Sequence, residues 1–222
     1  MTTLILIPAY KEGKQIFKVI ADIKTKVRIP FEVLVIDDGS GDNTGFEAKR
    51  AGAKVLRHGI NRGQGASLKT GIDFAIGEGL YDKVVFFDAD GQMSAEEIPM
   101  LCQVLDDGYD VALGSRFLGK VIDMPPAKRL TLKLALIFTR ITSGLKLTDT
   151  HNGFQAWKIE ALKKINLTQD RMAYASQIIN EISRCHLKFK EIPVTIRYTE
   201  YSKAKGQSIS NSIKILWDLF IK

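Results

Sequence analysis

The chain has 222 residues, of which 45% are hydrophobic and 26% are charged, and this ordinary globular balance excludes low-complexity and repeat architectures. The length suits one sizeable α/β domain better than two compact domains. A formal net charge of +7 favours anionic partners, which include nucleotide phosphates, anionic lipid and nucleic acid, without choosing among them.

The first predicted unit is a strand over residues 4–7, a loop, and a helix over residues 16–27. The loop holds Pro8, Tyr10 and Glu12 at the carboxyl end of the strand, where open α/β sheets bind ligands. An aromatic ring there can stack on a base, and a carboxylate can accept a hydrogen bond from a base or ribose. Taken alone, the same segment is typical of an ordinary βα turn.

The second predicted strand, residues 31–36, leads into Asp37 and Asp38 and then into a polar, glycine-containing segment. That segment predicts a tight turn and a cap for the next helix. Capping explains Ser40, Asp42 or Thr44, but it does not require two carboxylates at the end of the strand.

Residues 54–57 are the third predicted strand, followed by a glycine-rich segment and a helix over residues 66–79. Closely spaced glycines let the backbone approach a ligand, and the amino end of a helix can face phosphate. The segments that begin at Gly39 and Gly63 both lack the third glycine of the dinucleotide fingerprint, which disfavours a Rossmann dehydrogenase. His58, a lone histidine, is interpreted as a loop residue rather than a catalyst.

The fourth predicted strand, residues 84–87, is an unbroken apolar run that indicates burial on both faces, and it delivers Asp88 and Asp90 to its carboxyl end. In an extended chain alternate side chains point the same way, so these carboxylates converge and Gln92 comes within reach. Two nearby like charges are costly unless a cation neutralises them, and hard oxygen donors suit Mg²⁺ or Mn²⁺. The alternative interpretation is a solvated acidic turn.

A capping box at Ser94 and Glu97 predicts the start of the next helix, and residues 110–114 are the next predicted strand. We expect that strand to end at Ser115 and Arg116, where the arginine could pair with a diphosphate. The repeated alternation of strands and helices predicts a mainly parallel sheet with helices on both faces.

The second half has a less regular pattern. Residues 127–143 predict a helix that mixes apolar and basic side chains, which suits either core packing or an interfacial position, and we favour packing. The later predicted elements are a polar loop over 148–154, a strand over 155–158, a helix over 174–185, a strand over 192–197 and a polar basic loop over 198–208. An amphipathic helix over residues 209–222 then suits a membrane surface, a partner helix or docking on the domain.

Cysteine usage and hydropathy bear on the compartment. Cys102 and Cys185 lack metal-ligand spacing, which indicates two packed thiols in a reducing compartment. Residues 1–8 lack the basic n-region of a signal peptide. The most apolar stretch, residues 130–141, is interrupted by Lys133 and Arg140 and is shorter than the roughly 20 residues that span a bilayer. We therefore expect neither a signal peptide nor a spanning helix.

The order of several motifs is more specific than any one of them. The motifs are Pro8-Ala-Tyr-Lys-Glu12, Asp37-Asp-Gly-Ser40, Asn61-x-Gly-x-Gly65, Asp88-Ala-Asp-Gly-Gln92, Gly114-Ser-Arg116, and Asp149 with Gly153-Phe154. In this order they resemble the family 2 glycosyltransferases. The closest resemblance is to the polyprenyl-phosphate branch, which includes dolichyl-phosphate mannosyltransferase and bacterial undecaprenyl-phosphate sugar transferases, and it extends to about Ser208.

The resemblance implies an α/β nucleotide-diphospho-sugar transferase fold of glycosyltransferase type A, with one catalytic domain over residues 1–208. Residues 1–116 would form the nucleotide-sugar-binding half and residues 117–208 the acceptor half, with the amphipathic helix beyond. The implied activity is transfer of a sugar, with inversion, from a UDP- or GDP-sugar to a polyprenyl phosphate for cell-surface glycan assembly. Mg²⁺ or Mn²⁺ would be the cofactor. The implied location is cytoplasmic, peripheral at the inner face of the cell membrane, on the membrane surface or a small membrane subunit. A homo-oligomer is compatible with this interpretation, and nucleic acid is not an expected partner.

The resemblance also assigns residues. The nucleotide-sugar would contact Pro8, Ala9, Tyr10, Glu12, Val35, Asp37, Asn61, Gly65, Asp88, Ala89 and Asp90. The metal would be held by Asp88, Asp90 and Gln92. The phosphates would face Arg116, Arg197, Lys203 and Lys205, and the catalytic residues would be Asp90, Arg116 and Asp149.

Two positions depart from the family pattern. Lys11 stands where the family commonly has Asn. The closing Arg-x-x-Gly-x-Ser-Lys motif appears as Arg197 followed, without that glycine, by Ser202 and Lys203, with Lys205 close behind. The phosphate role could therefore fall to either lysine.

Three other functions compete with this one. A phosphate acceptor has a second pKa near 6 and needs little deprotonation, whereas a hydroxyl acceptor would need a general base, for which Asp149 is the candidate. A hydroxyl-acceptor glycosyltransferase is therefore the first competitor. A phosphatase with a nucleophilic Asp usually carries it on the first strand, with Thr or Val soon after, whereas here the motif comes late and is followed by Gly-Gln. The third competitor is a non-enzymatic nucleotide-binding partner of a membrane complex.

Overall fold

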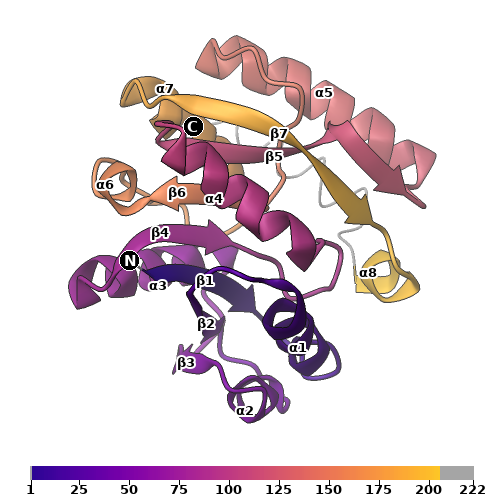
Figure 1. Ribbon diagram of the computed structural model, residues 1–222. Helices are drawn as coiled ribbons and strands as arrows, with labels where there is room; N and C mark the ends of the chain where they lie inside the picture. The colour runs from indigo at the N-terminus through magenta and orange to yellow at the C-terminus, as the bar shows by residue number, and fades with distance from the viewer. Residues whose placement is uncertain (1, 206–222) are drawn as a thin grey trace.

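A seven-stranded sheet forms the centre of the structure, a computed structural model that describes residues 2–205 (Figure 1). Its strand order is β3-β2-β1-β4-β6-β5-β7. β6 runs antiparallel to both of its neighbours, and the other neighbouring strands pair in parallel. The predicted mainly parallel sheet with helices on both faces is therefore confirmed.

Strands and helices alternate through the first half of the chain. In order, they are β1 (Thr2–Ala9), α1 (Ile16–Lys26), β2 (Phe31–Asp37), α2 (Thr44–Arg50), β3 (Lys54–Arg57), α3 (Gln64–Glu78) and β4 (Tyr81–Phe86). Because β1 to β4 are parallel, their carboxyl ends lie at one edge of the sheet, and the loops that follow them meet there.

The second half adds strands on the other side of β4. In order, its elements are a short 3-10 turn η1 (Ala95–Glu97), α4 (Ile98–Asp106), β5 (Val111–Ile122), α5 (Pro126–Ser143), β6 (Gln155–Lys158), α6 (Ile159–Leu162), α7 (Tyr174–Arg184), β7 (Phe189–Arg197) and α8 (Glu200–Lys205). The sheet is thus shared between both halves of the chain.

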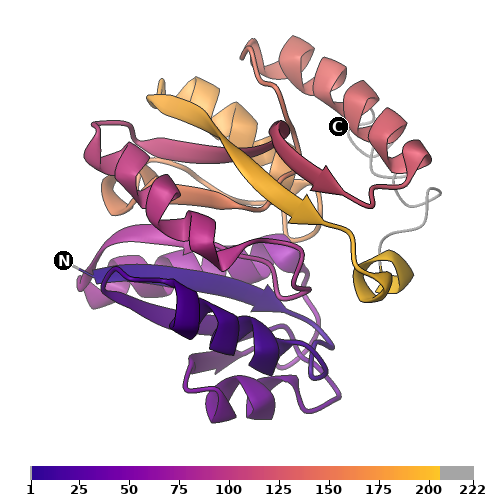
Figure 2. The same ribbon diagram turned by 45° about the vertical axis from the view of Figure 1, so that its right-hand side comes forward.

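The core has two layers because successive residues of a strand point to opposite faces. Ile5 and Ile7 of β1 pack with α1, α2 and α4, whereas Leu4 and Leu6 pack with α3, α6 and α7. Burial on both faces explains why the central strands are unbroken apolar runs in the sequence. α5 packs against α7 on the side of the sheet away from β1 to β3 (Figures 1 and 2), and its Leu136 belongs to the layer of Leu4 and Leu6.

The predicted end of β5 was wrong, because this strand continues past Arg116 to Ile122. Its pairing with β7 shifts register between Ser115 and Lys120. A Cβ at Gly119 would lie 2.2 Å from the carbonyl oxygen of Val194, so only glycine lets the two backbones approach this closely. The irregularity carries the strand onward and leaves Arg116 in its middle.

The predicted capping box was also wrong. The carboxylate of Glu97 does not return to the start of its own helix but accepts the backbone N–H of Thr195 in β7, at 3.0 and 2.9 Å. A tertiary contact has replaced a local one.

The segment predicted as a loop over residues 198–208 contains the short helix α8. The N–H of Ser202 donates to the hydroxyl of Thr199 at 3.1 Å, so Thr199 caps this helix. The predicted helix over residues 209–222 lies outside the described residues. Within residues 2–205, no helix is both long enough and apolar enough to cross a bilayer.

Candidate functional site

The Asp88–Asp90 turn follows β4 at the carboxyl edge of the sheet. The chain does not stay extended there: Gly91 has a φ of 74°, and the N–H of Gln92 donates to Oδ1 of Asp90 at 3.0 Å. The carbonyl of Gln92 accepts the N–H of Arg197 at 2.9 Å, which joins this turn to the end of β7. The sequence placed Gln92 beside the two carboxylates only if the chain stayed extended. The chain turns at this point instead, so the role of Gln92 at the metal stays a prediction.

The two carboxylates of this turn interact electrostatically. Burial and the neighbouring charge of Asp90 raise the pKa of Asp88 to about 7, against the opposing effects of Arg116 and a hydrogen bond from Gln64. That hydrogen bond runs from Nε2 of Gln64, at the start of α3, to Oδ1 of Asp88 at 3.0 Å. Deprotonation of Asp88 is thus less favourable than that of an ordinary aspartate.

The donor set of this turn fits a hard divalent cation such as Mg²⁺ or Mn²⁺, because both side chains offer carboxylate oxygens. A Cβ at position 153 would lie 2.9 Å from Oδ2 of Asp88, so Gly153 keeps the space beside this oxygen open. Among the described residues, no three His, Cys, Asp or Glu side chains gather into a metal cluster. An ion held by Asp88 and Asp90 would therefore need further ligands of another kind, such as phosphate oxygens.

The loop after β1 is held by the turn after β2. The N–H of Lys11 donates to the hydroxyl of Ser40 at 2.9 Å, and the N–H of Glu12 donates to the hydroxyl of Thr44 at 2.8 Å. These hydroxyls therefore bind the neighbouring loop, whereas α2 has no side-chain cap at Asn43. Ser40 and Thr44 therefore do not cap α2, whereas Oδ1 of Asp42 accepts the N–H of Thr44, the first residue of that helix, at 3.1 Å. The first two motifs form one structural unit.

Asp38 organises the glycine-rich segment after β3. Its carboxylate accepts the N–H groups of Arg62 and Gly63 at 2.9 and 2.7 Å and the side chain of Asn61 at 2.9 Å, and it contacts Nδ1 of His58 at 2.7 Å. The sequence indicated that Asp38 has a further role, because capping did not explain a second carboxylate after β2. Asn61 and His58 thus have structural partners in Asp38.

Asp37 is buried beside Asp38 and has its own partners. Its Oδ1 accepts the N–H of Ser40 at 3.0 Å, and Nε of Arg57 lies 3.5 Å from Oδ2. Asp37 thus contributes to the same turn that holds the first loop, and its predicted contact with base or ribose stays a prediction.

Three other residues assigned to the nucleotide-sugar are buried or closely packed, and their predicted contacts with it stay predictions. The side chain of Val35 has no exposed surface and belongs to the core, and Ala89 is buried between the two acidic residues. A Cβ at Gly65 would lie 2.0 Å from the carbonyl oxygen of Gln169, so glycine lets this second-half segment close onto the start of α3. Pro8, Ala9 and Tyr10 follow one another at the end of β1, with Tyr10 exposed.

Arg116 and Asp149 form a buried ion pair. Oδ2 of Asp149 accepts the backbone N–H and Nε of Arg116 at 2.8 and 2.7 Å, while Oδ1 accepts the N–H of Thr150 at 2.7 Å. The guanidinium also donates to the hydroxyl of Tyr198 at 3.0 Å and to the carbonyl of His151 at 3.0 Å. This geometry makes Asp149 an orienting partner for Arg116 and leaves neither of its oxygens without a donor.

Lys128, which sequence reasoning did not single out, adds positive charge beside this pair. Burial and, to a lesser degree, the charge of Arg116 lower the pKa of the Lys128 ammonium. Burial and the charge of Arg116 also lower the pKa of His151 to about 4, so that its imidazole is neutral at pH 7. The basic residues in the predicted helix were the signal for Lys128, but only the fold shows that its side chain is partly buried and interacts with the charge of Arg116.

The remaining predicted phosphate ligands lie on or after β7. Arg197 is exposed and adjoins the Asp88–Asp90 turn through its hydrogen bond to Gln92. Lys203 and Lys205 lie in α8, and the placement of their side chains is not described. α8 is brought to the nucleotide half by Tyr201, whose hydroxyl donates to Oε2 of Glu12 at 2.7 Å.

The site therefore combines opposite charges at one sheet edge. Asp88 lies close enough to Arg116 for the charge of this arginine to oppose the rise in the pKa of Asp88. Paired carboxylates can hold a divalent cation, and the cationic group can attract phosphate oxygens. This combination suits the binding and departure of a metal-chelated diphosphate.

Comparison with known proteins identifies the family. The family described as glycosyl transferase family 2 matches residues 4–165. A polyprenol monophosphomannose synthase from Mycolicibacterium smegmatis is 31% identical over 95% of this chain and 84% of that protein. A UDP-N-acetylglucosamine--dolichyl-phosphate N-acetylglucosaminyltransferase from Methanococcus voltae is 30% identical over 98% of this chain and 94% of that protein.

Solved structures support the same fold. Glucosyl-3-phosphoglycerate synthase from Mycobacterium tuberculosis, in complex with uridine diphosphate, superposes with a TM-score of 0.74 over 97% of this chain and 77% of that chain, at 19% identity. This likeness bears on architecture alone, and it matches the predicted glycosyltransferase type A fold. With the family match over most of its length, the chain belongs to glycosyl transferase family 2.

Proposed function

We propose that this glycosyltransferase moves a sugar, with inversion, from a nucleoside diphosphate sugar to a polyprenyl phosphate, with the help of Mg²⁺ or Mn²⁺. The observation that carries the proposal is that the Asp88 carboxylate, beside Asp90 at the carboxyl edge of the sheet, lies within electrostatic reach of the buried Arg116 guanidinium. The relatives named as polyprenyl-phosphate sugar transferases support the same acceptor.

The donor would bind at the carboxyl ends of β1, β2 and β4. Asp88 and Asp90 would hold the metal, and when bound there the ion would supply electrostatic stabilisation for the departing diphosphate. Arg116 and Arg197 would add positive charge on the same side. Glu12 and Tyr10 would face the base or ribose, as the resemblance implies, and the choice between UDP and GDP is part of the test.

The acceptor side supports a phosphate rather than a hydroxyl. A phosphate monoester is largely dianionic at neutral pH and attacks without a general base. Asp149, the candidate base for a hydroxyl acceptor, has both oxygens engaged with N–H donors and pairs with Arg116. The site thus provides cations for a phosphate and no unengaged carboxylate at this position for deprotonating a hydroxyl.

The location follows from the acceptor. A polyprenyl phosphate resides in a bilayer, so we propose that the enzyme works as a peripheral protein at the cytoplasmic membrane surface, in cell-surface glycan assembly. A small membrane subunit and self-association are further proposals that the same experiments can address by adding membranes and by sedimentation.

The test is transfer of labelled sugar from UDP- and GDP-sugars, with Mn²⁺ or Mg²⁺, into organic-extractable product in the presence of polyprenyl phosphate. We expect extractable label that disappears in Asp90→Ala. Asp73→Ala is the matched control, because Asp73 is an exposed aspartate on α3 whose partner is Lys69. Nucleotide binding or donor hydrolysis without lipid product, or transfer to sugar hydroxyls instead, would contradict the proposal.

A further inference from the structure

α5 carries apolar side chains on two opposite faces. Its buried residues are Leu132, Ala135, Leu136, Thr139 and Ser143, and they face the domain. Leu130, Leu134, Ile137 and Ile141, which we call the outer stripe, are 62%, 55%, 53% and 77% exposed. The spacing of these four residues places them on one line along the helix, opposite the buried face. A helix with this pattern has a second apolar surface that the domain itself does not bury.

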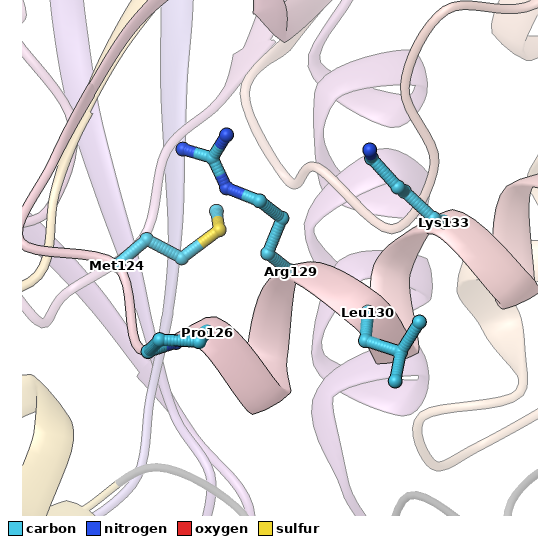
Figure 3. Close-up of a pocket in the computed structure, with 5 residues that line it drawn as sticks. All are labelled: Met124, Pro126, Arg129, Leu130 and Lys133. Carbon is cyan, nitrogen blue, oxygen red and sulfur yellow. The ribbon is translucent and has the colours of Figure 1, made fainter.

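The charged residues of α5 itself all have one sign. From Pro126 to Ser143 the helix contains no Asp or Glu, and its charged residues are Lys128, Arg129, Lys133 and Arg140. Arg129, Lys133 and Arg140 are exposed. Arg129 and Lys133 project to the same side of α5 while Leu130 projects to another (Figure 3). An apolar stripe flanked by cations matches a surface that is apolar inside and anionic at its rim.

A hollow at the start of α5 has the same mixed character. It is lined by Met124, Pro126 and Leu130 together with Arg129 and Lys133 (Figure 3). Long basic side chains can keep their charge at a polar boundary while their stems cover apolar surface. The hollow therefore extends the outer stripe toward the beginning of the helix and supplies cations at its edge.

α5 contacts the segment before β6 through Thr139 on its inner face and through Arg140 at the edge of that face. The hydroxyls of Thr139 and Thr150 lie 3.1 Å apart, and Nε of Arg140 donates to the carbonyl of Leu147 at 2.6 Å. Both contacts fall on the segment that carries Asp149, the partner of Arg116. The outer stripe and the segment that carries Asp149 therefore lie on opposite sides of α5, separated by the diameter of the helix, about 10 Å.

We propose that the outer stripe of α5 is the surface by which this protein lies on an anionic lipid bilayer. The inference deepens the proposed function and rests on it for the acceptor: a bilayer against this face would bring the phosphate of a lipid-linked acceptor to the level of Arg116 and Lys128. The charge pattern selects an anionic membrane over a second copy of the chain, because two copies facing each other here would bring like charges together.

The binding test uses the full chain and co-sedimentation with vesicles of equal parts phosphatidylglycerol and phosphatidylcholine. We expect Leu134→Ser with Ile137→Ser to weaken vesicle binding by at least about tenfold, and Leu130→Ser with Ile141→Ser to act similarly. Leu80→Ser is the matched control, because Leu80 is 60% exposed but lies outside α5. Circular dichroism of every variant checks that the fold is retained. Arg129→Gln with Lys133→Gln should lower binding by about fivefold per charge and reduce its salt dependence.

Other results would overturn the inference. One is that the wild-type chain does not bind the vesicles. Another is that both stripe variants bind them as well as the Leu80 control does. A third is that the wild-type chain is a dimer and the stripe variants are monomers that still bind vesicles. The last result would assign the stripe to a second copy of the chain.

A transfer assay separates this inference from the proposed function. With a short, water-soluble polyprenyl phosphate the stripe variants should keep wild-type transfer, whereas transfer to a long-chain acceptor in vesicles should fall with binding. Stripe-dependent vesicle binding without transfer to either acceptor would retain the membrane surface and overturn the proposed function. Transfer in vesicles that the stripe variants leave unchanged would uphold the function and overturn the membrane surface.

Discussion

The buried pair of Arg116 and Asp149 gives the sharpest prediction for a single substitution. In Asp149→Asn the side chain keeps its size but loses its charge. Oδ2 of Asp149 accepts Nε of Arg116 at 2.7 Å, and Oδ1 accepts the N–H of Thr150 at 2.7 Å. An amide NH₂ would face an N–H donor in either orientation. The substitution therefore removes an ion pair and also creates a donor–donor contact.

The magnitude follows from burial, since the side chains of Arg116 and Asp149 are 6% and 2% exposed. Removing one partner of a buried pair leaves an uncompensated charge and costs about 3 to 5 kcal/mol. That is a large part of the roughly 5 to 15 kcal/mol that stabilises a typical domain. The measurement is the free energy of unfolding from urea titration, monitored by circular dichroism.

Two further variants control this measurement. Glu160→Gln removes one partner of the exposed pair with Lys163 and should cost about 0.5 kcal/mol or less. Arg116→Met with Asp149→Leu removes both charges and should be closer to wild type in stability than Asp149→Asn, although it should be inactive. A loss below about 1 kcal/mol in Asp149→Asn would refute the reasoning. Because Asp149 orients Arg116, we also expect Asp149→Asn to impair lipid-phosphate and hydroxyl transfer alike.

The remaining predictions concern pH and backbone strain. Because the pKa of His151 is about 4 when folded and about 6.5 when unfolded, the unfolded state binds the extra proton. The free energy of unfolding should therefore fall as the pH drops from about 6.5 towards 4. In His151→Gln the midpoint of urea unfolding should change less with pH over this range. An unchanged slope would contradict the lowered pKa of His151. The raised pKa of Asp88, about 7, predicts that Mn²⁺ competes with a proton there. Calorimetric Mn²⁺ affinity should fall below pH 7 and be lost in Asp88→Asn, whereas pH-independent binding would place the ion elsewhere. Lys11 has a φ of 55°, a conformation that asparagine tolerates better, so Lys11→Asn should raise the unfolding free energy by about 0.5 to 1 kcal/mol. Lys14→Asn serves as the control, and a loss of stability in Lys11→Asn would argue against strain at this position.

The sequence was informative wherever one residue pattern has one structural meaning. The apolar runs of β1, β2 and β4 predict buried parallel strands, because only residues covered on both faces are apolar without interruption. The same strands set the order of the motifs, so the carboxyl edge of the sheet was predictable as the site.

Local patterns with more than one meaning were misleading. Ser94 and Glu97 match a capping box, yet Glu97 binds β7, and the hydroxyls of Ser40 and Thr44 hold the loop after β1 instead of capping α2. In each case the side chain found a partner far along the chain. Sequence spacing contains no information about that partner.

What the sequence by itself determined is the α/β architecture, the family, and the identity of the acidic and basic residues around the sheet edge, since these depend on periodicity and motif order. The tertiary structure alone decided how those residues are paired. Arg116 and Asp149 belong to segments 33 residues apart and become a buried pair because β5 continues past the expected end and the loop before β6 returns to it. The two faces of α5 were decided in the same way, because an apolar helix surface is buried or exposed only according to what the rest of the fold places against it.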